Sequence, residues 1–413
     1  MPNNKFLKIF ICIILALFLC GVFVYFLLPK IGNQVSYNSE ESSKSISNDN
    51  QVMGSQDEIS NKTEDAVPVV ENPVINPIVV THIETPQTIK AVYISAWVAG
   101  SPKFRDSIIK MIDDTELNTI VIDVKDSTGR VSFDMPVPSV QKEGSIEKRI
   151  ANIRSLTDLL HKKNIYIIGR VSVFQDPYMT KKHPEWSVTK KSDGAVWKDR
   201  KGLSFLDPAK KEVHDYILAV AKGAYEEGFD EINFDYIRYP SDGNMKDINY
   251  HLATGETRAD NIEKFFKYLN TELKKEKNIP MSADLFGLTT EATDDMGIGQ
   301  VWEKAYPYFD FLCPMVYPSH YPAGHMGYKN PSLYPYEVIN QALLGAISKT
   351  TKIQGDKNKI RPWLQDFDMG ATYTKELVKK QFGAVYDNGL KSWMLWDPAN
   401  KYTPSALELT TIE

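Results

Sequence analysis

The chain has 413 residues, with 48 lysines and arginines against 53 aspartates and glutamates and a net charge of −5. This balance excludes the strongly basic surface typical of nucleic-acid-binding proteins, so we expect no nucleic-acid partner. Of the three cysteines, Cys12 and Cys20 lie in the first thirty residues and only Cys313 lies beyond them. An internal disulfide is therefore excluded in the main part of the chain, which must be stabilised by a large hydrophobic core.

The first predicted element is an uncharged apolar run from Ile9 to Leu28. Its length, about twenty residues, is that of a transmembrane helix. Lys5 and Lys8 precede it and predict a cytoplasmic N-terminus with the rest of the chain outside the cell membrane. A cleaved signal peptide is the alternative, although no Ala-x-Ala site follows the run. We expect residues 1–30 to be a single-pass anchor in the membrane.

Residues 31–88 are rich in Ser, Asn and acidic side chains and contain a single aromatic residue, Tyr37. A segment of this composition cannot bury enough apolar surface to fold by itself. Its last part, "VPVVENPVINPIVV" (67–80), carries three prolines and predicts an extended spacer. We expect a disordered acidic linker between the anchor and a folded domain over residues 89–413, which we expect to be monomeric.

In residues 89–413, short β-rich apolar runs alternate with helical patterns, which is typical of parallel βαβ units. Eight such repeats predict an α/β fold of the (β/α)₈ TIM-barrel type. An open doubly wound sheet is the alternative, but no Gly-x-Gly-x-x-Gly or P-loop follows any strand, so we expect no nucleotide cofactor. The predicted strands are "KAVYISAW" (90–97), "NTIVIDVKD" (118–126), "YIIGRVSVF" (166–174), "EINFDYIRY" (231–239), "MSADLFG" (281–287), "DFLCPMVY" (310–317), "IRPWLQDF" (360–367) and "KSWMLWDP" (391–398).

The connections between these strands carry further signals. Ser101-Pro102 and Asp207-Pro208 each place a capping residue before a proline, which predicts helices that begin at the prolines. Only "TPSALELTTIE" follows the last strand, so the last helix is predicted to be stunted. The long connection over 175–207 carries Trp186 and Trp197, whose rings we expect to stack on sugars.

Polar residues gather toward the C-terminal ends of the predicted strands. In the fourth strand, alternation places Ile232, Phe234 and Tyr236 on the helix-facing side and Asn233 and Asp235 on the inner side. Arg238 follows three residues after Asp235, which puts it on the opposite face unless the strand has already ended. The predicted ring around the barrel mouth comprises Asp123, Lys125, Arg170, Asp235, Asp284, Tyr317, Gln365 or Asp366, and Trp396 or Asp397.

Such a ring suits glycosidic cleavage, which needs one carboxyl group as acid and a second as nucleophile or base. Asp235 and Asp284 come from neighbouring strands at similar heights, about 5 Å apart, which predicts a retaining enzyme. Lys125 and Arg170 could keep one carboxylate ionised while burial keeps the other protonated.

Each candidate also has a structural reading. An aspartate at a strand end often caps a loop or pairs with an arginine, and this alternative stays open for Asp123, Asp235 and Asp284. His320 and His325 share one loop, but no His-Glu-x-x-His helix occurs, so we expect no metal site. Cys313 lies in a buried strand and is expected to act as a small hydrophobe.

At these strands the chain resembles a bacterial family of barrels described as a putative glycosyl hydrolase domain. The resemblance covers about Lys90 to Pro398 and depends on "VIDVKDSTG", "GFDEINFDYIRYP", "PMVYPSHY" and "WLQDF". It implies a TIM barrel with glycosidase activity. A more distant similarity to family 18 chitinases preserves Asp230 and Asp235, but Ile237 stands where their acid glutamate would fall.

These observations lead to two functional hypotheses. The first is a membrane-tethered extracellular glycoside hydrolase that acts on a cell-envelope or extracellular polysaccharide, with Asp235 and Asp284 as its catalytic pair. The second is a barrel at the cell surface that binds glycans without cleaving them. The remaining ring residues, with Arg238 and the two loop tryptophans, are expected to contact the sugar, and no cofactor is expected.

Overall fold

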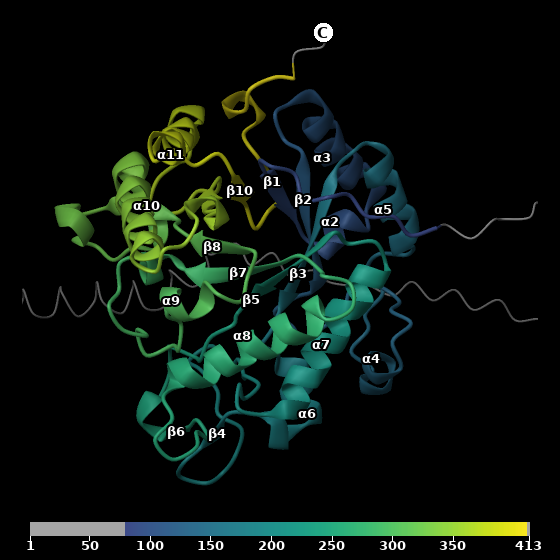
Figure 1. Ribbon diagram of the computed structural model, residues 1–413, viewed down its shortest axis with the longest axis vertical. Helices are drawn as coiled ribbons and strands as arrows, with labels where there is room; N and C mark the ends of the chain where they lie inside the picture. Colours follow the sequence, from purple (N-terminus) through teal and green to yellow (C-terminus); the bar gives the residue numbers. More distant parts are fainter. Residues whose placement is uncertain (1–78, 411–413) are drawn as a thin grey trace, which may run out of the picture. The chain divides into compact units, whose positions relative to one another are not determined.

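The computed structural model describes residues 79–410, and eight parallel strands at its centre close into a barrel (Figure 1). The closure is direct, because the first strand pairs with both the second and the last. This finding confirms the predicted α/β barrel and excludes the open sheet. The barrel strands are β1 (Lys90–Ile94), β2 (Thr119–Lys125), β3 (Tyr166–Ser172), β5 (Glu231–Asp235), β7 (Met281–Phe286), β8 (Phe311–Met315), β9 (Trp363–Gln365) and β10 (Trp393–Trp396).

Helices surround the strands and connect most of them (Figure 1). They are α2 (Ala96–Ala99), α3 (Pro102–Asp114), α4 (Pro138–Glu143), α5 (Ile153–Lys162), α6 (Pro177–Lys182), α7 (Lys211–Glu226), α8 (Arg258–Lys274), α9 (Trp302–Ala305), α10 (Pro335–Lys352) and α11 (Lys375–Asp387). The connection after β3 also contains β4 (Thr189–Lys190), which pairs with β6 (Ile248–Asn249) from the connection after β5.

Two predicted helix starts have different outcomes. Helix α3 begins at Pro102, as its sequence predicts. Helix α7 begins at Lys211 rather than Pro208, because the Asp207 carboxylate accepts a hydrogen bond from the Ala209 N–H in a separate turn and also contacts His251. The stunted last helix is confirmed as far as residue 410: between β10 and that residue the chain forms a single 3₁₀ turn, Pro404–Ala406.

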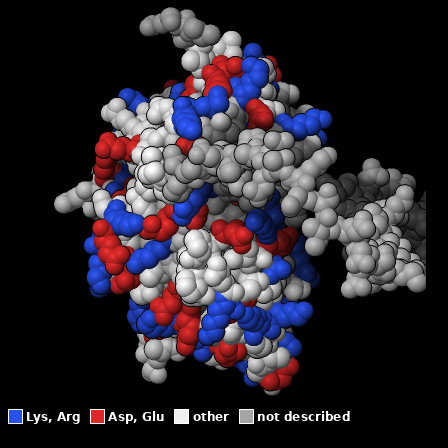
Figure 2. Space-filling view, turned by 90° about the vertical axis from the view of Figure 1, so that its right-hand side faces the viewer, with Lys and Arg blue, Asp and Glu red and all other residues white. Residues whose placement is uncertain are grey.

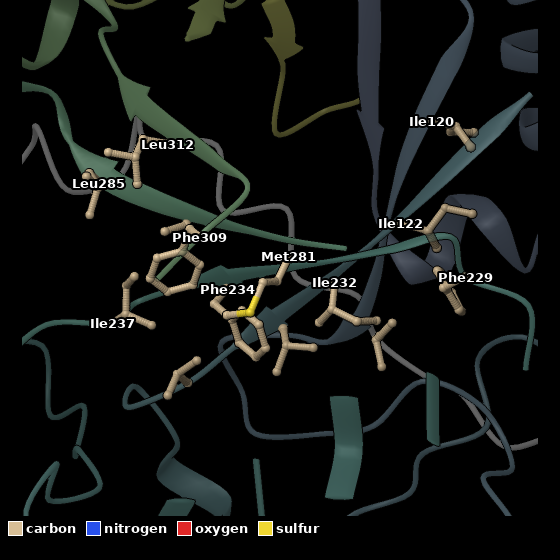
Figure 3. Close-up of a cluster of buried hydrophobic side chains, with 14 of the residues drawn as sticks. Ile120, Ile122, Phe229, Ile232, Phe234, Ile237, Met281, Leu285, Phe309 and Leu312 are labelled. Atoms are coloured by element: carbon tan, nitrogen blue, oxygen red, sulfur yellow. The ribbon is translucent and has the colours of Figure 1, made fainter. Parts of the chain in front are cut away.

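The hydrophobic core has two layers because strand residues alternate between the two faces of the barrel wall. The outer layer fills the space between strands and helices. Figure 3 shows part of it, with Ile232 and Phe234 of β5 close to Phe229 and Phe309 from the segments before β5 and β8. Phe234 is completely buried, and such burial stabilises a fold by about 1.5–3 kcal/mol per side chain. The inner layer lies inside the barrel and includes Tyr166, Ile168 and Met394.

The N-terminal end of the barrel, which we call the floor, is closed by polar and apolar contacts. Glu231 at the start of β5 forms an ion pair with Arg361, and both side chains are fully buried. The segment that precedes β1 covers this end: Ile83 packs against the inner layer and donates its N–H to Asp230, and Thr85 hydrogen-bonds the Tyr166 hydroxyl. These contacts leave the opposite end, the mouth, as the place for a site.

Within residues 79–410, no helix is long and apolar enough to cross a membrane. The predicted anchor at residues 1–30 and most of the predicted linker lie outside the described residues. On the face shown in Figure 2, basic and acidic side chains are interspersed, which agrees with the even charge balance of the sequence.

Candidate active site

The site begins where strand β5 ends. The strand stops at Asp235, and Tyr236 adopts a left-handed backbone conformation with a φ of 52°. This conformation is uncommon for a residue other than glycine, and it interrupts the alternation of the strand. As a result Tyr236 and Arg238 both line the mouth, on the same side as Asp235. The predicted helix-facing position of Tyr236 is therefore wrong. The strand has ended before Arg238, which was the condition for Arg238 to lie on the same side as Asp235.

The Asp235 carboxylate accepts hydrogen bonds from three N–H donors. Its Oδ2 accepts from Nε and Nη2 of Arg170, at 3.1 Å and 2.5 Å, and its Oδ1 accepts from the Tyr236 backbone N–H at 2.6 Å. Hydrogen bonds from a guanidinium and from backbone amides favour the charged form of a carboxyl group. The side chain is almost completely buried, so these donors replace the water that it has lost.

Arg170 is fixed on its other side by Asp123. The Asp123 carboxylate accepts from Arg170 Nη1 at 2.6 Å and from the Tyr93 hydroxyl at 2.6 Å. The two carboxylates hold the pKa of Arg170 well above its usual value despite the opposing effect of burial. Trp396 completes this arrangement, since its ring stacks on Tyr93 and the guanidinium lies 5.0 Å from its centroid. Asp123 therefore orients Arg170 rather than facing the cavity.

Asp284 has different hydrogen-bond partners from Asp235. Its Oδ1 accepts hydrogen bonds from Asn233 at 2.8 Å and Trp363 Nε1 at 2.7 Å. Burial, together with the nearby charge of Asp235, raises the pKa of Asp284 to about 8. The register pairs Phe234 with Ala283, so the two aspartates follow at the same level on adjacent strands, which lie about 4.8 Å apart. The two neighbouring carboxyl groups therefore have different surroundings: Asp235 contacts a guanidinium, whereas Asp284 has a raised pKa.

The two aspartates open into a cavity of about 250 Å³ at the mouth. Several predicted site residues meet there: Arg170, Arg238, Tyr317 and Trp396. Four further lining residues were not predicted to be site residues: Tyr236, Phe286, Met315 and His320. The sequence held a signal for two of them, since Phe286 and Met315 are the last residues of β7 and β8 and alternation from Asp284 points Phe286 inward.

Like Asp123, the predicted ring residues Lys125, Gln365 and Asp366 do not line this cavity. Lys125 is completely buried, and its ammonium contacts Asp176 at 2.8 Å and the Ser172 carbonyl at 2.6 Å, because the pairing of β2 with β3 shifts between Asp123 and Lys125. Its predicted role beside the catalytic pair is wrong.

Gln365 and Asp366 hold loops together instead. Gln365 accepts from the Ser319 N–H at 3.1 Å and donates to the Phe367 carbonyl at 2.9 Å. Asp366 accepts from the N–H and hydroxyl of Thr403, at 2.8 and 2.7 Å. Burial raises the pKa of Asp366 to about 7, but its partners are those of a structural residue.

The two loop tryptophans are not exposed sugar platforms. Trp197 is 1 % exposed and belongs to a small separate core with Val188, Phe205 and Ile248, so the prediction for it is wrong. Trp186 packs against the main core and stacks on His183.

An exposed indole lies elsewhere, on the connection that follows β1. Trp97 is 63 % exposed, and the Arg149 guanidinium lies 4.9 Å from the centre of its ring. Arg149 is itself buried and paired with Asp126, so it supports one face of the indole. No group of three potential metal ligands occurs in residues 79–410.

Comparison with known proteins places this geometry in context. Among curated proteins, no sequence matches this chain. Among solved structures, a hypothetical protein from Ruminiclostridium thermocellum is 33 % identical, over 47 % of this chain and 96 % of its own length, with a TM-score of 0.43. The PgaB (BpsB) glycoside hydrolase domain from Bordetella bronchiseptica is 11 % identical, over 78 % of this chain and all of that domain, with a TM-score of 0.58. The latter shows a shared fold.

A family model gives the more specific result. The model described as "Putative glycosyl hydrolase domain" matches residues 91–402. This range contains all the residues that line the mouth, and all residues of the barrel strands apart from Lys90. This match covers well over half of the chain and agrees with the resemblance found in the strand-end motifs. The barrel, with its two neighbouring aspartates at the mouth, thus belongs to the family described as a putative glycosyl hydrolase domain.

Proposed function

We propose that this protein is a retaining glycoside hydrolase in which Asp284 is the general acid and Asp235 the nucleophile. The observation that carries the proposal is the contrast between the two carboxyl groups in one cavity. Arg170 and the Tyr236 N–H stabilise the charge on Asp235, while burial raises the pKa of Asp284 to about 8. Glycosidases use such a pair, with one carboxyl group protonated and the other ionised at working pH.

In the first step, an Asp235 oxygen attacks the anomeric carbon while Asp284 gives its proton to the glycosidic oxygen. The carbon–oxygen bond to the leaving sugar breaks, and an ester forms between the glycan and Asp235. In the second step, Asp284, now ionised, takes a proton from a water molecule whose oxygen attacks the same carbon. The ester breaks, and the charge returns to Asp235, where Arg170 stabilises it. Each group ends in its original state.

The height of the two aspartates supports retention of configuration. They follow matched residues on adjacent strands, and a spacing of about 5 Å leaves no room for a water between a carboxylate and the sugar. Proton NMR of the first-formed product tests this directly. A product with the inverted anomeric configuration would mean that Asp235 activates water instead of attacking carbon.

A screen of polysaccharides for the release of reducing ends tests the activity itself. We expect wild-type protein to release them from at least one polymer, and Asp284→Asn protein to release almost none. The competing hypothesis, a barrel that binds glycan without cleaving it, predicts retention on an insoluble polymer with no release of reducing ends by any variant. The matched charged and protonated carboxyl groups favour hydrolysis, since binding alone does not require them.

We also propose that the barrel acts outside the cell, tethered to the membrane. The support is the apolar run from Ile9 to Leu28, preceded by Lys5 and Lys8. Protease added to spheroplasts should release a soluble fragment that begins between residues 31 and 89. Protection of the barrel from the protease would contradict this orientation.

A further inference from the structure

Arg238 is the charged residue of the cavity that the proposed mechanism leaves unused. Its Nη1 donates to the Tyr239 carbonyl at 3.2 Å and to the Ser241 hydroxyl at 3.3 Å. Both acceptors are neutral, and both hydrogen bonds are long. Within residues 79–410, no carboxylate lies within ion-pair distance of this guanidinium. Arg238 therefore brings a positive charge to the mouth that the described protein does not neutralise by contact.

The comparison with Arg170 shows which part of Arg238 remains available. Arg170 uses the edge formed by Nε and Nη2 to hold both of its hydrogen bonds to Asp235. The same edge of Arg238 donates to no group in the part of the chain that the structure describes. Two parallel N–H groups on this edge match the two oxygens of a carboxylate. Arg238 thus presents to the cavity the same donor pair that Arg170 presents to Asp235.

Arg238 is half-buried, and the charges nearest to it compensate this burial incompletely. Burial lowers the pKa of Arg238 more than the charges of Asp235 and Asp199 raise it, whereas carboxylates in direct contact raise the pKa of Arg149 and Arg361 despite burial. A charge withdrawn from water is normally compensated by a partner of opposite charge. Arg149 contacts Asp126 and Arg361 contacts Glu231, but no carboxylate of residues 79–410 contacts Arg238 in this way. A ligand with a negative charge would supply it.

We propose that Arg238 binds a carboxylate of the substrate, so that the glycan is acidic and carries this group on the sugar held in the cavity. The inference depends on the proposed function and specifies its substrate class. Arg238 lines the same cavity of about 250 Å³ as Asp235 and Asp284, so the carboxylate lies close to the bond that is cleaved. The apolar surfaces of Phe286 and Met315 on the cavity wall are available to the carbon face of the sugar.

The test uses the purified full-length chain and pairs of polymers that differ only in charge. Polygalacturonate, alginate and hyaluronan are each compared with their own carboxyl-reduced forms, and kcat/KM is measured from reducing ends. The variants are Arg238→Gln, which loses the charge, and Arg238→Lys, which retains it without the paired donors. Arg200→Gln is the matched control, because Arg200 also lies on a loop but is exposed and contacts Asp242 on the surface.

We expect the wild type to prefer at least one acidic polymer over its reduced form by tenfold or more. Arg238→Gln should lower kcat/KM on that polymer by about 10- to 100-fold, as expected for a charged hydrogen-bonded contact, and change it by less than about threefold on the reduced form. Arg238→Lys should recover part of the loss. Arg200→Gln should behave as wild type on both.

The outcomes separate this inference from the proposed function. If the wild type cleaved the carboxyl-reduced polymers as fast as the acidic ones or faster, the inference would be wrong and the proposed hydrolase activity would be unaffected. The same would follow if Arg238→Gln lost equal kcat/KM on the acidic and the reduced polymer. Binding of an acidic polymer that Arg238→Gln abolishes, without cleavage by any variant, would refute the hydrolase and support the acidic ligand. Failure to bind or cleave any acidic polymer would refute the inference.

Discussion

The two ends of strand β5 carry the same chemical pair in two different settings. Glu231 at the floor and Asp235 at the mouth are both buried carboxylates, and each contacts an arginine. At the floor, Ser282 and Tyr166 donate further hydrogen bonds to Glu231, and neither Glu231 nor Arg361 lines the cavity. At the mouth, Asp235 faces a cavity and lies level with the protonated Asp284.

This difference shows that a buried ion pair alone indicates little about function. The floor pair places two opposite charges in contact inside the barrel, away from the cavity, and its expected role is structural. The mouth pair is accompanied by features that a structural role does not require: a second carboxyl group with a raised pKa, a cavity, and a left-handed backbone at Tyr236. Substitutions at the mouth should consequently lower activity, and substitutions at the floor should lower stability.

The largest expected effect is on catalysis at the mouth. Asp235→Asn and Asp284→Asn should each reduce kcat by about 10²–10⁴-fold, the usual contribution of a positioned acid or base. Asp235→Asn should lower the melting temperature less than a change at the floor, because Arg170 keeps its ion pair with Asp123. A substrate with an activated leaving group needs no proton from the acid, so it should restore turnover in Asp284→Asn but not in Asp235→Asn. A loss below tenfold at either position would remove that residue from the mechanism.

The next effect is on stability at the floor. Glu231→Gln leaves the Arg361 charge buried without its partner, which should lower the free energy of unfolding by about 3–5 kcal/mol. Urea unfolding of Glu231→Gln and wild-type protein measures this difference. The fraction that remains folded should keep its kcat within about twofold, because Glu231 does not line the cavity. A loss of kcat comparable to that of Asp235→Asn would break the distinction between the two ends.

A smaller effect concerns pH. The acid must be protonated to act, and Asp284 is protonated below its pKa of about 8. Activity should therefore be retained at neutral pH and decline as the pH rises through 8, by about tenfold per pH unit above it. A pH profile of kcat/KM measures this limb. With the activated substrate, the decline of kcat/KM above pH 8 should be absent in Asp284→Asn. If the decline remained in this variant, a group other than Asp284 would cause it.

The smallest effect concerns the edge of the mouth. We expect the exposed face of Trp97 to stack on a sugar of a long substrate outside the cavity. Trp97→Ala should raise KM for a polymer by about fivefold, since such a contact contributes about 1 kcal/mol, and leave kcat for a small aryl glycoside unchanged. Trp186→Ala is the control, because Trp186 packs against the core and should alter stability instead. Equal KM values for wild type and Trp97→Ala would exclude this platform.

Much of the barrel could be predicted from the sequence, because strand alternation depends on local residue order. The eight strands, and the inward positions of Asp123, Arg170, Asp235 and Asp284, followed from that pattern. Alternation failed wherever the backbone departs from a regular strand. The register shift after Asp123 redirected Lys125, and the left-handed turn at Tyr236 brought Arg238 to the mouth.

The aromatic residues show a second limit of sequence-based prediction. Trp197 was expected on the surface because it lies in a long loop, yet that loop builds a small core of its own around Val188 and Phe205. Exposure of Trp97 depends on Arg149, which is far away in the sequence and fills the space beneath the ring. Such contacts are set by tertiary packing and leave no local pattern.

The sealed floor has a consequence for how water moves through the barrel. Ile83, Tyr166 and the Glu231–Arg361 pair close that end, so among the described residues the mouth is the route into the cavity. A cavity of 250 Å³ holds roughly eight waters at the density of the liquid, and a bound sugar displaces them. Under the proposed mechanism, the hydrolytic water enters only after the leaving sugar has departed. An added alcohol follows the same path, so it should compete with water and produce a transglycosylation product.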